Sequence, residues 1–153
     1  MVDLTLLTTA MVDTFRKIPE LVAALNGAPE AIFGYYDLNP DRNSLTNAVY
    51  TQPPGSILVA WTETAFAEEE IGCWLHAYGY YVRAPRKGSP IALITALVNG
   101  IPMPGDGLIW RFCPVMDGVL PTQIINISRI PDAEGIDYYV VTTETKETGD
   151  ANA

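Results

Sequence analysis

The sequence is poor in charged residues, and poorest in basic ones. Only 18% of its 153 residues are charged, and nine Lys and Arg stand against eighteen Asp and Glu, which gives a formal net charge of −9. Proteins that read nucleic acids or bind anionic membranes usually carry a basic face, so this balance argues against both kinds of partner. Because 48% of the residues are hydrophobic, the chain can bury a core and still expose apolar surface for partners.

Cysteine and histidine are scarce as well. Cys73 and Cys113 are isolated in a chain large enough to fold without disulfides, which predicts reduced thiols in structural roles. His76 is the single histidine, so a multi-histidine metal centre is excluded. The sequence also lacks an uninterrupted transmembrane run and the basic start of a secretory signal. We therefore expect a soluble, cytosolic protein.

The first residues have the spacing of an amphipathic helix. Apolar residues recur at steps of three and four over residues 4–18, which predicts one buried stripe on a helix with Asp3 as its N-cap. Pro19 cannot donate a hydrogen bond to the carbonyl four residues earlier, so the helix bends or restarts there. The dipeptide Asn26-Gly27 marks its end. The sequence therefore predicts a long, bent N-terminal helix.

Two segments rich in aromatic and β-branched residues predict an antiparallel pair of strands, Ser56–Phe66 and Ile71–Ala84. In the second strand the period of two divides the side chains between two faces. One face carries Trp74, His76, Tyr78, Tyr80 and Val82, and the other carries Cys73, Leu75, Ala77, Gly79 and Tyr81. Both faces are largely apolar, which predicts contacts on both sides of the strand.

The remaining segments complete a mixed architecture. A short helix is expected over Pro90–Asn99, with Ser89 as its cap and Gly100 as its end, followed by strands at Leu108–Phe112, Thr122–Ile130 and Ile136–Glu147. The order α-β-β-α-β-β predicts a single α+β domain over residues 1–147, with a mostly antiparallel sheet packed against the long N-terminal helix and the short middle helix. Long loops are expected at 28–55 and 100–121, and a disordered tail at 148–153.

Two patterns resemble chemical sites, and both are incomplete. Cys73 and His76 are three residues apart on one strand, so the thiol and the imidazole face opposite sides and cannot form a dyad. Residues 37–43 alternate Asp and Asn like the first half of a calcium loop, but Arg42 stands where that loop needs glycine and Ala48 where it needs glutamate. We therefore expect no metal, no cofactor and no enzymatic activity. A small enzyme or ligand-binding α+β domain, with a pocket between sheet and helices, is the alternative.

Aromatic residues supply the candidate interaction surface. In an acidic chain, aromatic side chains on strands favour packing or a protein interface over base stacking. The residues expected to contact further subunits or partners are Trp61, Trp74, Tyr78, Tyr80 and Tyr81. The run Glu68-Glu69-Glu70 lies between the two predicted strands, where a solvated turn is expected.

The order of elements resembles that of the tail terminator and tail completion proteins of long-tailed bacteriophages, over about Leu4 to Glu147. The resemblance depends on a set of segments that follow one another in the family's order. These are the N-terminal helix ending at Leu25-Asn26-Gly27, the entry Pro53-Pro54-Gly55-Ser56 into the strand Ile57-Leu58-Val59, the partner strand ending Tyr81-Val82-Arg83-Ala84, the helix Pro90–Asn99 and the last strand from Asp137.

The resemblance implies a structural virion protein without catalytic residues. Such proteins form a ring, usually of six subunits, that ends the tail tube and joins it to the head connector or stopper protein around a lumen for DNA. The implied partners are further copies of the chain, the tail tube protein and the connector, in a virion neck assembled in the host cytoplasm. Glu68-Glu69-Glu70 becomes a candidate lumen-facing acidic turn, with an outward, solubilising turn as the alternative. A head-closure or adaptor protein of the same neck is the alternative role.

Overall fold

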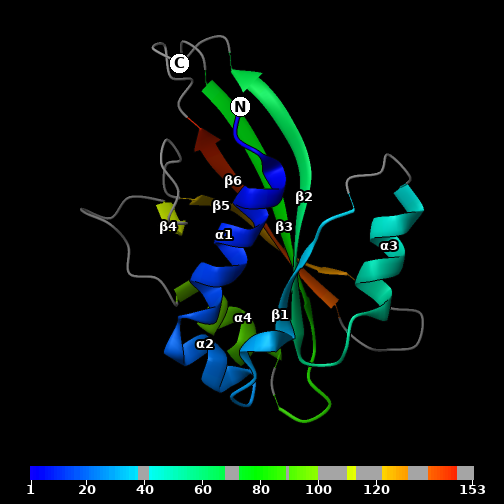
Figure 1. The fold of residues 1–153 in the computed structure, drawn as a ribbon. Coiled ribbons are helices and arrows are strands. Elements are labelled where there is room, and N and C mark those ends of the chain that lie inside the picture. The colour runs from blue at the N-terminus through cyan, green and yellow to red at the C-terminus, as the bar shows by residue number, and fades with distance from the viewer. Residues whose placement is uncertain are drawn as a thin grey trace.

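In the part of the chain that the structure describes, the fold combines four α-helices, a short 3-10 helix and six strands (Figure 1). A computed structural model describes residues 1–37, 42–67, 73–88, 90–99, 110–112, 122–130 and 138–147. In chain order the elements are α1 (Leu4–Arg16), α2 (Pro19–Ala24), η1 (Pro29–Ala31), β1 (Ile32–Tyr35), α3 (Arg42–Thr51), β2 (Ser56–Ala67), β3 (Cys73–Arg83), α4 (Pro90–Asn99), β4 (Trp110–Phe112), β5 (Thr122–Ile130) and β6 (Tyr138–Glu147).

The strands form one twisted sheet in the order β1-β2-β3-β6-β5-β4. Strand β1 runs parallel to β2, and every other pair of neighbours is antiparallel. The prediction of an α+β fold with a mostly antiparallel sheet is therefore confirmed. Strand β3 pairs with β6 without a break from Trp74 to Arg83, so its side chains alternate between the two faces as the period of two predicts.

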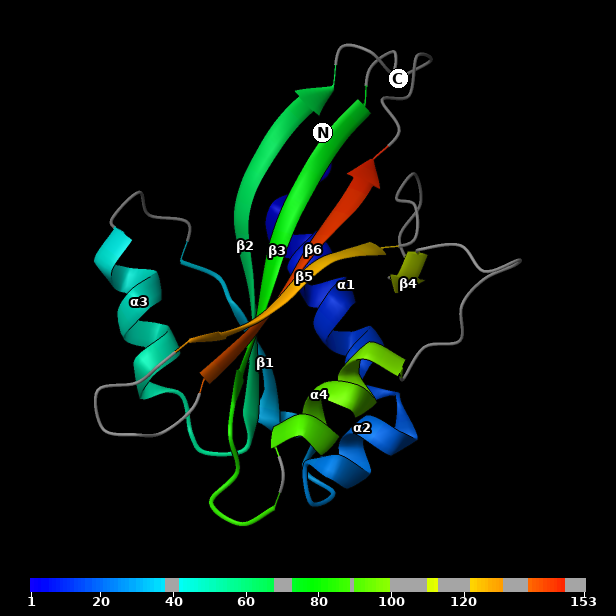
Figure 2. The same ribbon diagram turned by 180° about the vertical axis from the view of Figure 1, so that it is seen from behind.

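Helices cover the two faces of the sheet unequally. Helices α1, α2 and α4 lie on one face, and α3 packs on the opposite face at one end (Figures 1 and 2). The main core lies under the three helices. There the rings of Phe15 and Tyr80 pack edge to face, with their centres 5.0 Å apart. Val49 of α3 packs with Leu58 and Tyr138 in a second, smaller cluster. We refer below to the face under α1, α2 and α4 as the helix-covered face.

The N-terminal helix is interrupted at the position that the proline predicts. The Asp3 carboxylate accepts hydrogen bonds from the backbone N–H groups of Thr5 and Leu6, at 2.8 and 3.4 Å. Helix α1 ends at Arg16, and α2 restarts with Pro19 in its first turn. The expectation of a cap and a bend is confirmed, but the long helix is divided into segments of 13 and 6 residues.

The expected loop at 28–55 is wrong in two places, because it contains β1 and α3. The backbone of β1 pairs with residues Ile57–Ala60 of β2. Helix α3 places Leu45, Ala48 and Val49 on one side, against the sheet. This three-and-four spacing is a helix signal that the high content of Pro, Asn and Asp outweighed in the prediction. The order α-β-β-α-β-β is therefore incomplete.

Several predicted features lie outside the described residues. They are the turn with Glu68-Glu69-Glu70, the cap Ser89, Cys113, the turn at 131–135, the tail at 148–153 and most of the loop at 100–121. Within that last range the structure describes β4. The strands predicted at Thr122–Ile130 and Ile136–Glu147 are confirmed as β5 and β6, which pair antiparallel.

Candidate functional site

A buried polar network lies on the helix-covered face, close to the start of α1. It is centred on His76, whose side chain has no exposed surface. Thr64 is the cross-strand neighbour of His76 on β2, and Glu147 is the last residue of β6, two residues beyond the other neighbour, Thr145. Because cross-strand neighbours point to the same face, three strands bring a hydroxyl, an imidazole and a carboxylate together.

The hydrogen bonds of this network run in one direction. The Trp61 indole N–H donates to Thr64 Oγ1 at 2.8 Å, and Thr64 Oγ1 lies 2.8 Å from His76 Nδ1. On the other side of the ring, His76 Nε2 lies 3.4 Å from Glu147 Oε2. An ionised carboxylate only accepts, so Nε2 carries the proton and Nδ1 accepts the proton of the Thr64 hydroxyl. Every donor in the series then meets an acceptor.

Burial keeps the imidazole neutral at physiological pH. Desolvation lowers the pKa of His76 below its usual 6.5, and this effect outweighs the hydrogen bond and the charge of Glu147, which raise it. Glu147 itself accepts hydrogen bonds from the backbone N–H of Val2 through both carboxylate oxygens, one of them at 3.0 Å. The network therefore ties the segment before α1 to the ends of β2, β3 and β6.

The order hydroxyl, imidazole, carboxylate is also the order found in hydrolytic triads. Here the Thr64 oxygen already accepts the indole N–H of Trp61, and the imidazole is enclosed. The arrangement can hold a proton on Nε2 and fix strand positions. It supports a structural role for His76, in keeping with the predicted separation of Cys73 and His76 on opposite faces of β3.

A second buried contact fixes α1 on the sheet. The hydroxyl groups of Thr8 and Tyr78 lie 2.8 Å apart, and Tyr78 Oη lies 3.3 Å from the backbone oxygen of Leu4. Burial raises the pKa of Tyr78 to about 12, although the hydrogen bond to Thr8 acts in the opposite direction. The tyrosine thus stays protonated and acts as a hydrogen-bonding anchor for the first turns of α1.

The structure divides the aromatic residues that were predicted to contact partners. Tyr78 and Tyr80 have no exposed surface and belong to the core under α1. Their side chains therefore pack within the chain and have no surface that a partner could contact. Trp61, Trp74 and Tyr81 are only partly buried, and contacts through them stay a prediction. The acidic turn Glu68-Glu69-Glu70 lies outside the described residues.

Large apolar side chains are exposed on β2 and β5, the second strand from each edge of the sheet, and we refer to these two sides of the sheet as its flanks. Phe66 on β2 is 50% exposed and packs its ring on Trp74 of β3, with ring centres 5.0 Å apart. Ile125 and Ile127 on β5 are 53% and 48% exposed. Sequence analysis did not single out these three residues, because a strand pattern does not say which strands become the flanks of a sheet.

A basic pocket lies at the opposite end of β2 and β3 from Phe66. Its volume is about 610 Å³, and it forms where the end of α2 and the segment after it meet the chain leading into β2 and out of β3. Arg86 and Lys87 supply two exposed cations to its wall, while Pro54 and Pro85 supply apolar surface. Such a pocket can accommodate an acidic group of a partner.

The structure describes only the two ends of the half calcium loop. Residues 38–41 lie outside the described part, and α3 begins at Arg42. The Asp37 carboxylate accepts a hydrogen bond from Ser44 Oγ at 2.8 Å, and Ser44 Oγ accepts one from Tyr35 at 2.6 Å. Within the described residues, no three His, Cys, Asp or Glu side chains are grouped as metal ligands.

Of the residues in the polar network, sequence analysis singled out His76 and Trp61, the latter as a candidate interface residue. Thr64 and Glu147 become neighbours of His76 through the pairing of β2, β3 and β6. A bulge at Thr62 shifts the β2 register by one residue, and no sequence signal predicts it.

Among the described helices, none is long and apolar enough to cross a membrane. No protein-family model matches the chain, and no curated protein matches it.

Proposed function

We propose that the chain is a structural subunit of a ring at the head–tail junction of a long-tailed bacteriophage. The ring terminates the tail tube and joins it to the head connector, and DNA passes through its lumen. The order of α1, β2, β3, α4, β5 and β6, which resembles that of tail terminator and tail completion proteins, supports the proposal. A net charge of −9 suits a conduit that must not retain DNA.

The observation that carries the proposal is the exposure of large apolar side chains on two opposite flanks of one sheet, Phe66 on β2 and Ile125 and Ile127 on β5. Exposed apolar side chains do not stabilise a monomer in water. Two different apolar flanks, however, allow each subunit to contact two neighbours. Contacts between unlike surfaces repeat around an axis and close into a ring when the rotation fits.

Light scattering after size exclusion, with negative-stain images, tests the assembly. We expect a species of about six subunits with a central hole, in line with the closed symmetry of most oligomers. A strict monomer up to high micromolar concentration contradicts the proposed ring.

Deletion of the gene from its phage tests the place in the neck. Without a terminator, tube growth has no stop, so we expect tails of irregular length that do not join heads. Tails of normal length that fail to join heads favour the head-closure or adaptor role. Normal virions, with loss of a chemical activity in the host extract, favour the enzyme alternative.

A further inference from the structure

We propose that neighbouring copies join by adding the outer edge of β5 in one subunit to the outer edge of β2 in the next, so that one sheet continues from subunit to subunit. This inference depends on the proposed ring and names the surfaces that would build it. It goes beyond the apolar flanks, because it specifies which strands pair, in which direction and in which register.

Both strands have an outer edge that is open among the residues the structure describes. Strand β1 pairs with β2 only over Ile57–Ala60, which leaves residues 61–67 of β2 without a described neighbour on that side. Strand β4 pairs with β5 only at Thr122 and Gln123. Residues 124–130 of β5 are therefore also without a described neighbour on their outer side. Unpaired strand edges present backbone N–H and C=O groups that readily pair with another chain.

The directions of the strands favour a junction between unlike edges. Counting across the sheet, β2 and β6 run one way, and β3 and β5 run the other way. If the next subunit keeps the same orientation, its β2 therefore meets β5 in the antiparallel sense. The junction then repeats the pairing found within the sheet and keeps the helix-covered faces of all subunits on one side.

The regular parts of the two edges have equal length. Strand β2 pairs regularly over Glu63–Ala67 after its bulge, and β5 pairs regularly over Asn126–Ile130 after its own. Phe66 lies opposite Trp74, and Ile127 lies opposite Val141. Both side chains are thus on the helix-covered face. The antiparallel register that sets Phe66 opposite Ile127 sets Ala65 opposite Ser128 and pairs the two five-residue runs end to end.

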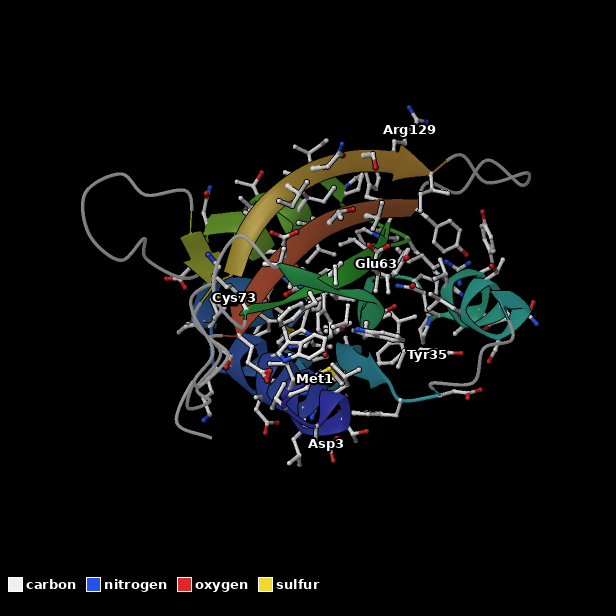
Figure 3. The ribbon with its side chains drawn as sticks, turned by 90° about the horizontal axis from the view of Figure 1, so that it is seen from above. Met1, Asp3, Tyr35, Glu63, Cys73 and Arg129 are labelled. Atoms are coloured by element: carbon white, nitrogen blue, oxygen red, sulfur yellow. The ribbon has the colours of Figure 1, made fainter. Side chains whose placement is uncertain are left out.

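The charged residues of the two runs do not meet across this junction. Glu63 is the one charged residue of the β2 run, and Arg129 is the one charged residue of the β5 run; Figure 3 shows both. In the proposed register Glu63 lies opposite Ile130 and Arg129 lies opposite Thr64, so the two side chains point to opposite faces of the joined sheet. The head-to-tail contact with a second copy therefore depends on the directions and the matching lengths of the two runs.

Disulfide trapping tests the register. Ala65 and Ser128 are both exposed and directly opposite in the proposed junction, at a separation that a disulfide can span. Under mild oxidation we expect the double variant Ala65→Cys/Ser128→Cys to form a ladder of covalent multimers on a non-reducing gel. A mixture of the two single variants should stop at covalent dimers, and each single variant alone should form none above the parent chain.

The matched control is Ala65→Cys/Ile127→Cys, in which the two thiols are on opposite faces of the joined sheet and should not cross-link. Covalent dimers from Ala65→Cys alone would show pairing of two β2 edges and overturn the proposal. A ring that forms but gives no cross-links in the double variant overturns the edge junction and leaves the proposed function standing. Cross-linked multimers that never close support the junction and contradict the ring.

Discussion

Among single residues, His76 makes the stability of the fold depend on pH. Burial lowers its pKa below 6.5 in the folded chain, so the unfolded chain takes up the proton at a higher pH than the folded chain does. The neutral imidazole therefore contributes stability that is present above pH 6.5 and is lost as the pH falls below this value. We expect the melting temperature to fall between about pH 7.5 and 5.5.

The variant His76→Gln separates this effect from the titration of carboxylates. Glutamine keeps a donor and an acceptor near Thr64 and Glu147 but does not titrate. We expect it to be less stable than the parent at neutral pH and to lose less stability on acidification. Parallel pH profiles of the two proteins, measured by thermal denaturation, would show that His76 is not the titrating group.

The Thr8–Tyr78 contact is the second residue-scale prediction. Thr8→Val and Tyr78→Phe each leave one buried hydroxyl without its 2.8 Å partner, so each should lower the free energy of unfolding by about 1–2 kcal/mol. The double variant should lose less than the sum, by about 1 kcal/mol. Thr5→Val makes the same change at an exposed site of α1 and should have little effect. Additive losses in urea denaturation would contradict the direct contact.

On the scale of the elements, the cap of α1 is a local feature with a measurable effect. The Asp3 carboxylate satisfies backbone N–H groups in the first turn, so Asp3→Ala should lower the free energy of unfolding by about 1 kcal/mol. Asp13→Ala makes the same substitution at an exposed position inside the same helix, where alanine is the better helix former. Equal losses in the two variants would contradict a capping role.

Elements defined by their own residues could be predicted, and elements defined by their neighbours could not. The periodicity of α1 and the composition of β2 and β3 predicted these three elements closely. The four-residue strand β1 is held mainly by its pairing with β2, and its short sequence carries little signal. The candidate site follows the same division, since His76 was found and Thr64 and Glu147 depended on the sheet register.

On the scale of the whole molecule, the sequence places residues of opposite charge at the two ends of the β2–β3 pair. One end carries the pocket with Arg86 and Lys87. The other leads, after Ala67, into the sequence Glu68-Glu69-Glu70. In a ring whose subunits share one orientation, like ends lie on the same rim. Each ring would then offer an acidic and a basic rim, which suits contact with the two different partners that we propose, the tube and the connector.

The acidic turn gives the final prediction. Six copies would bring roughly eighteen carboxylates to one rim, where they would repel phosphate if the turn faces the lumen. Replacing Glu68, Glu69 and Glu70 by Lys should leave the subunit folded, because the turn connects two strands that pair independently of it over eleven cross-strand positions. If the turn faces the lumen, we expect assembled particles that package DNA but fail to deliver it, since a basic rim retains the phosphate backbone.

Infectivity of complemented phage measures DNA delivery. A triple Gln variant, which removes the charge without reversing it, should keep an infectivity close to normal. Normal infectivity of a correctly assembled triple Lys variant would place the turn on the outside of the ring.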